Sequence, residues 1–318
     1  MLVVGGENLI DCVQMEQSDG GYPLFRVIPG GSPYNMAIAA GRQQIPTTYL
    51  TPISTDAHGD ALFSRLQDAD VRLSTPRIDA PSSLAMVSLR NGIPAYQFYR
   101  EHTAERLISD KMLKTALTEQ DRVFHIGSLA LAGGRDTDIW IEFAHHCKQS
   151  GLAVSLDPNV RAALIPDAAG YRQKIKQMFQ LADIIKCSDE DLSFIFETDE
   201  LPVMMRELTG CTGQNKILTI THGENGAYLC HHDAGEPEPS FIHHPAAQAQ
   251  PFVDTVGAGD TYMASMLAML IKENWLDNIS DLSLDNKIKM AEYAGRAAAL
   301  NCSRQGCNPP TSDEILSH

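Results

Sequence analysis

The pattern of apolar and polar segments predicts strands and helices that follow one another along the chain. Short apolar runs predict buried strands at residues 1–6, 47–53, 121–127, 153–158, 183–187 and 217–221. Amphipathic runs predict helices at residues 61–71, 136–150, 188–196 and 291–300. Strands that alternate with helices form a parallel sheet whose faces the helices cover. We therefore expect an α/β fold with a mostly parallel central sheet.

Three further segments have the features of exposed strands. Residues 22–28 alternate in polarity, and residues 84–90 and 95–100 flank Asn91-Gly92, which is a strong signal for a tight hairpin turn. We expect these segments to form a small antiparallel sheet over a cleft. Such a cover keeps water away from a reacting phosphate.

A long apolar run follows a glycine-rich loop near the C-terminal end. Residues 252–272 read FVDTVGAGDTYMASMLAMLIK, in which Gly257, Ala258 and Gly259 precede a helix expected from Thr261. This helix is apolar nearly all round, which predicts burial. Its first amides have no intrahelical partner, and the helix dipole favours negative charge there. The loop therefore predicts an anion site.

Asp260 stands at the mouth of this helix. An aspartate there can simply cap the helix. The glycines beside it, however, let a substrate approach the carboxylate and the amides together, which suits phosphoryl transfer. We expect the helix end to keep Asp260 ionised well below pH 7, so that it serves as a general base.

Composition and charge limit the partners. The 318 residues are 43% hydrophobic, enough for a large core, and their formal net charge is -15. This charge repels nucleic acid and anionic membranes, and it also opposes ATP. A nucleotide-binding site therefore needs local positive charge from helix N-termini, Mg²⁺ and individual basic side chains such as Arg161.

The cysteines and the N-terminal residues predict the compartment. The seven cysteines are odd in number and include no C-x-x-C pair, which is typical of reduced thiols. The N-terminal residues contain no basic segment, and no apolar span of about 18 residues follows them. We expect a cytoplasmic protein that does not enter a membrane.

Two segments carry a resemblance to a known family. The sequence DTVGAGDT at residues 254–261 is very similar to the C-terminal signature of the ribokinase (PfkB) family of small-molecule kinases, and GGSPYN at residues 30–35 resembles its N-terminal signature. The resemblance implies one three-layer α/β domain over residues 1–318, with a small antiparallel β lid from about residues 11–29 and 84–103. No G-x-x-x-x-G-K-[ST] motif occurs, and GAGDTY lacks the third glycine of a dinucleotide fingerprint.

The resemblance also implies roles in phosphoryl transfer. In this family the GAGD segment forms the anion hole and its Asp activates the acceptor hydroxyl. Gly257, Ala258 and Gly259 are then the anion hole, and Asp260 is the base. The segment DPNVR at residues 157–161 is similar to one in fructokinase-like members, so Arg161 is expected to meet the substrate or the transferring phosphate.

Sugar contacts are implied for the lid and its hinge. FYREHTAER at residues 98–106 looks like the lid segment of fructokinases and 2-keto-3-deoxygluconate kinases. The substrate-binding residues implied are Asp11, Gly30, Gly31, Asn35, Tyr99 and Arg100, with the glycines as the lid hinge. Without the resemblance, the lid positions fit a surface turn, a cross-strand tyrosine and a solvated arginine about equally well.

Nucleotide and metal contacts are implied in four places. KCSDEDL occupies the place of the family's N-x-x-E motif, so Asp191 would contact Mg²⁺ through water, although a plain capped helix fits these residues well. The nucleotide-binding residues implied are Lys186, Ser188, Thr221, Gly223, Gly226 and Asn301. Gly295 stands where many fructokinases have Asn. The residues at a monovalent cation (K⁺) site would be Asp254, Val256 and Gly306.

A group of histidines offers a competing site. His231, His232, His243 and His244 lie near Cys230 in the sequence, and together they could ligate a transition metal. Adjacent residues of a strand point to opposite faces, however, which favours a solvated hairpin.

These features predict an ATP- and Mg²⁺-dependent kinase that phosphorylates a primary hydroxyl of a small sugar. Fructose is the first acceptor, because FYREHTAER, DPNVR and KCSDEDL look most like fructokinases. The alternatives are 2-keto-3-deoxygluconate, whose carboxylate Arg100 or Arg161 would bind, and another small molecule such as a nucleoside. A non-catalytic sugar or nucleotide sensor and a nicotinamide enzyme are different classes. Paired lids predict a homodimer.

Overall fold

The computed structural model describes residues 1–17, 21–90, 93–212, 216–232 and 239–318. Within these residues a large sheet is mostly parallel, with an antiparallel edge formed by its last two strands. In spatial order its strands are β13 (Ser240–His244), β12 (Ala227–His231), β11 (Ile217–Thr221), β10 (Ile184–Ser188), β9 (Ala153–Asp157), β8 (Val123–Gly127), β1 (Leu2–Val4), β4 (Thr47–Tyr49) and β5 (Val71–Leu73).

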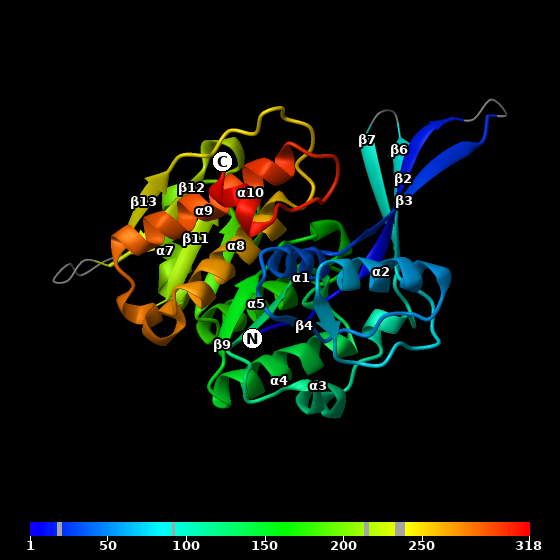
Figure 1. Cartoon of the computed structure of the whole chain (residues 1–318), viewed down its shortest axis with the longest axis horizontal. Coiled ribbons are helices and arrows are strands. Elements are labelled where there is room, and N and C mark those ends of the chain that lie inside the picture. The colour runs from blue at the N-terminus through cyan, green and yellow to red at the C-terminus, as the bar shows by residue number, and fades with distance from the viewer. Residues whose placement is uncertain (18–20, 91–92, 213–215, 233–238) are drawn as a thin grey trace.

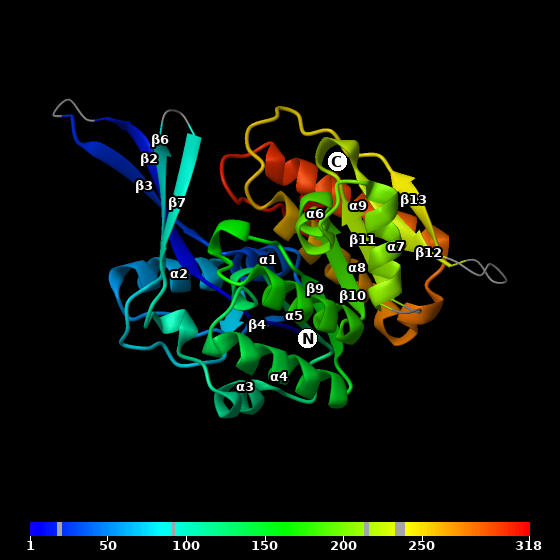
Figure 2. The ribbon, with the colours of Figure 1, turned by 180° about the vertical axis from the view of Figure 1, so that it is seen from behind.

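Helices cover both faces of this sheet, which gives three layers (Figures 1 and 2). On one face lie α1 (Ser32–Arg42), α2 (Ala57–Asp68), α8 (Ala258–Lys272) and α9 (Leu284–Cys302), with α10 (Ser312–Leu316) packed on α9. On the other lie α3 (Asp110–Ala116), α4 (Arg135–Gln149), α5 (Ala168–Leu181), α6 (Asp189–Phe196) and α7 (Leu201–Thr212). Strand alternation divides the core: Leu2 and Val4 enter one apolar cluster and Val3 the other.

Most predicted strands are confirmed within a few residues, and three helices begin earlier than expected. Helix α2 begins at Ala57 rather than at residue 61. Helix α8 begins at Ala258 rather than Thr261, because Gly257 adopts a left-handed conformation and ends the loop there. Helix α9 begins at Leu284, capped by Ser283, rather than at residue 291. Its first turns are rich in polar residues, which hides the apolar period.

The small sheet has a parallel centre that was not expected. Its spatial order is β3 (Pro23–Gly30), β2 (Leu9–Gln17), β6 (Leu84–Arg90) and β7 (Ile93–Tyr99). The β2–β3 and β6–β7 pairs are antiparallel, but β2 and β6 run parallel because each belongs to a separate hairpin. Strand β2 was missed, and the Asn91-Gly92 turn lies outside the described residues. The sheet projects from one side of the body (Figures 1 and 2).

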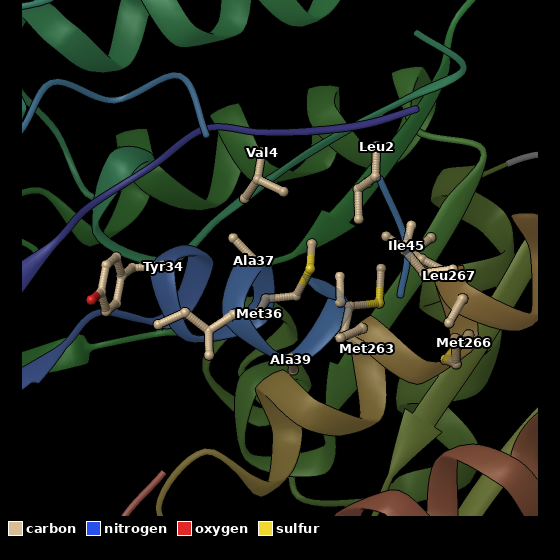
Figure 3. Close-up of a cluster of buried hydrophobic side chains, with 14 of the residues drawn as sticks. Leu2, Val4, Tyr34, Met36, Ala37, Ala39, Ile45, Met263, Met266 and Leu267 are labelled. Carbon is tan, nitrogen blue, oxygen red and sulfur yellow. The ribbon is translucent and has the colours of Figure 1, made fainter. Parts of the chain in front are cut away.

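Packing between α1 and α8 positions the candidate site. Figure 3 shows Met36, Ala37 and Ala39 of α1 gathered with Met263 and Met266 of α8 in the cluster under β1. A buried hydrogen bond of 2.9 Å from Gln43 Nε2 to Ser265 Oγ also joins the two helices. Ser32, the first residue of α1, also contacts Asp260 in the first turn of α8. The N-terminal ends of the two helices therefore lie together, although they come from opposite ends of the chain.

Candidate active site

Asp260 lies in the first turn of α8, facing α1. Its carboxylate is buried; Oδ1 accepts a hydrogen bond from Ser32 Oγ (2.7 Å), and Oδ2 accepts one from Asn35 Nδ2 (3.0 Å). Asn159 Nδ2, from the loop after β9, lies 3.4 Å from Oδ1. The N-cap of α8 is Gly257. Asp260 is therefore no cap, and its carboxylate is held by side chains from two other segments.

Burial raises the pKa of Asp260 above its ordinary value, although the hydrogen bonds from Ser32 and Asn35 and the charges of Lys186 and Arg161 oppose this rise. The helix end therefore does not set this pKa by itself, and the expectation that Asp260 is ionised well below pH 7 stays a prediction. Loss of water around the carboxylate outweighs the helix dipole. A carboxylate with a raised pKa accepts a proton more readily than an exposed aspartate, which suits a general base.

The backbone before Asp260 has the features of an anion hole. Among the described residues, no acceptor contacts the amides of Gly257, Gly259 and Asp260, whereas the amide of Ala258 donates to Thr255 O (3.1 Å). Gly257 has φ +76, and a Cβ there would clash with Cys307 Sγ. Three of the four expected amides therefore remain available to an anion at the positive end of α8.

Asn301 supports this loop from behind. It is fully buried; its Nδ2 donates to Val256 O (2.8 Å) and its Oδ1 accepts from the amide of Asn308 (2.9 Å). Asp254 accepts hydrogen bonds from the amides of Val256 and Gly306, both at 2.9 Å. The expected nucleotide contact of Asn301 is therefore replaced by a structural role, because both ends of its amide are used within the protein.

Lys186 brings a positive charge to the anion hole. Its Nζ lies 2.7 Å from Asp157 Oδ2, and both side chains are buried. A Cβ placed on Gly259 would lie 3.1 Å from the same Nζ. Burial alone lowers the pKa of Lys186, but Asp157, Asp191 and Asp260 together raise it above its ordinary value. The ammonium therefore stays charged beside the amides of α8.

Asp191 forms a capping box with Ser188 at the start of α6. Its Oδ2 accepts from the amide of Ser188 (2.8 Å), its Oδ1 accepts from the amide of Val160 (2.6 Å), and Ser188 Oγ accepts from the amide of Asp191 (3.0 Å). Each carboxylate oxygen thus already has a backbone donor. By contrast, Oδ1 of Asp157 is buried and has no hydrogen-bond partner among the described residues. Asp157 is thus better suited than Asp191 to face a cation.

The acceptor side of the site lies where the small sheet meets α1. Asp11 is located on β2 rather than in a loop after β1, and its Oδ2 would lie 2.5 Å from a Cβ on Gly30. Burial raises the pKa of Asp11 to about 6, and the nearby charge of Arg161 opposes the rise. Gly31 has φ +114, and a Cβ there would lie 2.6 Å from Glu7 O. Both glycines therefore permit close packing at the base of the small sheet.

Tyr99 ends β7, and Arg100 follows it directly. Arg100 is bound to Glu105, with 2.8 Å from Nε to Oε1 and 3.2 Å from Nη2 to Oε2. The strand registers align Asp11 with Ala85 and Phe98, which places Tyr99 on the opposite face of the small sheet. The register therefore does not support the expected contact of Tyr99 with a sugar at Asp11. The contact expected of Arg100, whose charge also lowers the pKa of Glu7 near Ser32, stays a prediction.

The expected nucleotide loop follows β11. Thr221 ends that strand in register with Ser188, and a short 3₁₀ helix (Gly223–Asn225) follows. A Cβ on Gly223 would meet nothing within 4 Å, so its surroundings are open. A Cβ on Gly226 would clash with His244 O, which shows that this glycine is required by the β12–β13 hairpin.

Sequence reasoning missed two residues at the base of α1. Ser32 lies inside the GGSPYN segment, but its contact with Asp260 depends on the packing of α8. Glu7 is buried, its Oε1 accepts from the amide of Ser32 (3.0 Å), and burial raises its pKa to about 7. The local signal for Glu7 in the sequence is its position directly after the two glycines that follow β1.

Three of the four histidines lie in β12 and β13, and His232 follows β12. The strand register aligns His243 with Tyr228 and His244 with Ala227, whereas His231 lies opposite Ser240. Within the described residues, no group of three His, Cys, Asp or Glu side chains could hold a metal ion. The same part of the chain contains no helix of the length and apolar composition that a membrane crossing requires.

A family model described as pfkB family carbohydrate kinase matches residues 1–314. The chain belongs to this family. It is therefore a carbohydrate kinase, a phosphotransferase with an alcohol acceptor, as the sequence predicted. A fructokinase of Rhizobium leguminosarum bv. trifolii is 34% identical over 90% of the chain and 85% of the relative. Fructokinase-1 of Zea mays is 30% identical over 99% of the chain and 96% of the relative.

Solved structures confirm the fold. A fructokinase of Xylella fastidiosa with bound ATP has a TM-score of 0.82 at 23% identity, covering 99% of this chain and 97% of that one. A fructokinase of Vibrio cholerae O395 in a fructose, ADP and calcium ion bound form has a TM-score of 0.80 at 20% identity, with coverage of 99% and 97%. The expected ribokinase-like fold class is confirmed.

Proposed function

We propose that this carbohydrate kinase is an ATP-dependent fructokinase that phosphorylates a primary hydroxyl of fructose. The observation that carries the proposal is the buried Asp260 carboxylate beside the open amides of α8 and the ammonium of Lys186. Fructose is favoured because relatives at 30–34% identity over most of the chain are fructokinases. The calcium, fructose and ADP in the Vibrio cholerae structure belong to that protein and serve here as analogy.

The chemistry that the site supports is direct transfer. Asp260 accepts the proton of the acceptor hydroxyl late in the reaction, when the bond to the γ-phosphorus is forming. The amides of Gly257, Gly259 and Asp260 and the charge of Lys186 stabilise the moving phosphoryl group. Asp11 and Asn35 hold the sugar, and Arg161 faces it from the loop after β9, with Gly30 and Gly31 as the lid hinge.

ATP and Mg²⁺ are proposed as cofactors. The open loop at Gly223, with Thr221 and Ser188 beside it, is the proposed nucleotide side of the cleft. Among the carboxylates, Asp157 fits a hydrated Mg²⁺, because its buried Oδ1 has no partner in the described part of the chain. When bound, the ion neutralises charge on the phosphates.

A requirement for K⁺ stays a prediction. Asp254, Val256 and Gly306 lie together as expected, but the amides of Val256 and Gly306 already occupy the Asp254 carboxylate, and Val256 O accepts from Asn301. These residues therefore do not form an open cation cage. Activity in potassium, sodium and tetramethylammonium salts of equal ionic strength tests the requirement.

A second acceptor, 2-keto-3-deoxygluconate, is favoured by one observation. The guanidinium of Arg161 is exposed, and its hydrogen bonds within the described residues use only Nη1. A sugar carboxylate could take the remaining donors. An intact Asp260 site argues against a non-catalytic sensor.

One assay separates these functions. ADP release is measured with ketoses, aldoses, keto-deoxy acids and nucleosides, each with and without Mg²⁺. We expect the highest kcat/KM with fructose and none without Mg²⁺. A preference for a keto-deoxy acid would move the assignment to the second acceptor, and no ADP release with any acceptor would support the sensor.

We propose a homodimer that joins two small sheets. Met15 on β2 and Leu24 on β3 are exposed, and Tyr22 precedes β3 with most of its surface exposed. Exposed apolar side chains gathered in this way are typical of a protein interface. A partner's small sheet would cover them.

A further inference from the structure

Ser32 connects the base to the loop that follows β9. Its Oγ lies 2.7 Å from Asp260 Oδ1 and 2.6 Å from Asn159 Nδ2. Arg161 Nη1 in turn lies 2.6 Å from Asn159 Oδ1. The four side chains form one continuous series of hydrogen bonds from an exposed guanidinium to a buried carboxylate.

The direction of each hydrogen bond follows from the chemistry of the groups. A guanidinium can only donate, so Asn159 must turn its oxygen to Arg161 and its NH₂ to Ser32. The NH₂ also only donates, so Ser32 Oγ accepts from it and directs its single proton to Asp260. Every donor in the series therefore points toward the carboxylate, and the series stabilises the ionised form of Asp260.

Two further observations indicate a fixed arrangement. Ser32 is buried, and its amide donates to Glu7 Oε1 at 3.0 Å. Asn159 has φ +39, a left-handed conformation that non-glycine residues adopt at a cost of about 1–3 kcal/mol. Its hydrogen bonds to Ser32 and Arg161 offset this cost.

We propose that Ser32 is a positioning residue for phosphoryl transfer: it holds Oδ1 of Asp260 and links it through Asn159 to the charge of Arg161. Among the described residues Oδ1 has two donors and Oδ2 has one, Asn35, so Oδ2 keeps the lone pair that takes the acceptor's proton. The acceptor oxygen then bonds to the γ-phosphorus, and ADP leaves with the electrons of the broken P–O bond. The proposal rests on the proposed kinase activity.

The test compares Ser32→Ala with the parent enzyme. We expect kcat to fall about 10- to 100-fold, because a hydrogen bond to a charged group is lost, while KM for sugar and ATP changes less than about threefold. The acid limb of the kcat–pH profile should move to higher pH, since the hydrogen bond from Ser32 lowers the pKa of Asp260. The other ionisable groups around Asp260 are unchanged in this variant: Lys186, Arg161, Asp157 and Cys307.

Further variants separate positioning from folding. Ser32→Thr keeps the hydroxyl and should recover most of kcat. Asn159→Gly is compatible with the left-handed backbone and removes the side chain that joins Arg161 to Ser32. Because both substitutions interrupt the same series of hydrogen bonds, the double variant Ser32→Ala/Asn159→Gly should have a kcat little lower than that of Ser32→Ala alone. Ser109→Ala, which removes the exposed N-cap hydroxyl of α3, is the matched control and should leave kcat unchanged.

A folded Ser32→Ala enzyme with kcat within twofold of the parent and an unmoved acid limb would overturn the proposal. If the parent releases no ADP with any acceptor, the kinase assignment fails by itself. The proposal is then decided by the ¹³C titration of the Asp260 carboxylate, assigned with Asp260→Asn. A higher midpoint in Ser32→Ala supports the positioning role, and an unchanged midpoint rejects it.

Discussion

Lys186 and Asp157 form an ion pair of 2.7 Å between Nζ and Oδ2, with only 4% and 2% of their side chains exposed. They come from neighbouring strands, β10 and β9, and the ammonium reaches the anion hole at Gly259. A buried pair of this kind contributes little net stability as a whole, but loss of one partner leaves an uncompensated charge in the interior.

Lys186→Met should therefore lower the free energy of unfolding by about 3–5 kcal/mol. Adding Asp157→Asn should recover part of the loss, because the remaining charge is removed. Lys174→Met breaks the exposed pair with Asp138 and is the control, with an expected cost of at most about 1 kcal/mol. Urea denaturation measures all three, and equal costs for Lys186→Met and Lys174→Met would contradict the prediction.

Asp260→Asn should reduce turnover by about a hundred- to ten-thousandfold, because the amide cannot accept the proton. The amide oxygen can still accept from Ser32, so the fold and the KM for ATP should change little. Steady-state ADP release and thermal melting check both parts. Turnover within a few-fold of the parent would remove Asp260 as the base.

Gly257→Ala should lower kcat at least about tenfold. It should also lower the free energy of unfolding by about 1–3 kcal/mol. The new methyl would meet Cys307 Sγ at a backbone φ of +76. Gly210→Ala is the matched control: it lies in the last turns of α7, where a Cβ would meet nothing within 4 Å, and it should be neutral or stabilising. If the two substitutions behave alike, the close packing at Gly257 is not what holds the anion hole.

Because of Glu7, the free energy of unfolding should fall as the pH rises. Its pKa is about 7 in the folded protein against 4.5 when exposed, despite the charge of Arg100. Between these values the unfolded chain loses a proton that the folded protein keeps, so the folded state is disfavoured by up to ~3 kcal/mol above pH 7. Glu7→Gln keeps the acceptor for Ser32, and relative to the parent it should gain stability between pH 5 and pH 8. If the difference in free energy of unfolding between Glu7→Gln and the parent stays constant from pH 5 to pH 8, Glu7 is ionised in the folded protein.

Leu24→Glu should convert the proposed dimer to a monomer, because it places a charge on the exposed face of the small sheet. Size-exclusion chromatography with light scattering measures the mass of each species. Leu316→Glu changes a still more exposed leucine, on α10, and should stay dimeric. A parent protein that is monomeric at every concentration tested would reject the lid-to-lid assembly.

The sequence predicted those parts of the site that depend on local chemistry. The left-handed glycine, the open amides and the carboxylate lie within four consecutive residues, Gly257 to Asp260, so their proximity needs no tertiary information. The two strands that supply Lys186 and Asp157 are predicted for a different reason: parallel strands bring their carboxyl ends to one edge of a sheet.

Packing decided the features that the residue patterns do not predict. The ion pair of Arg100 with Glu105 needs the turn after β7, which no strand pattern records. Asn301 is expected as a nucleotide contact, but its amide meets Val256 across the fold. The pKa of Asp260 depends on how deeply α1 covers it, which no pattern in residues 252–272 records.

The small sheet is assembled from two stretches of chain, residues 9–30 and residues 84–99, joined along β2 and β6. A chimera that grafts the acceptor preference of one relative onto another must therefore transplant both stretches together. Exchange of either stretch alone would pair strands β2 and β6 from two different relatives, and their side chains would not match. The catalytic loop before α8 can stay untouched in such a graft, so substrate choice and chemistry are separable by recombination.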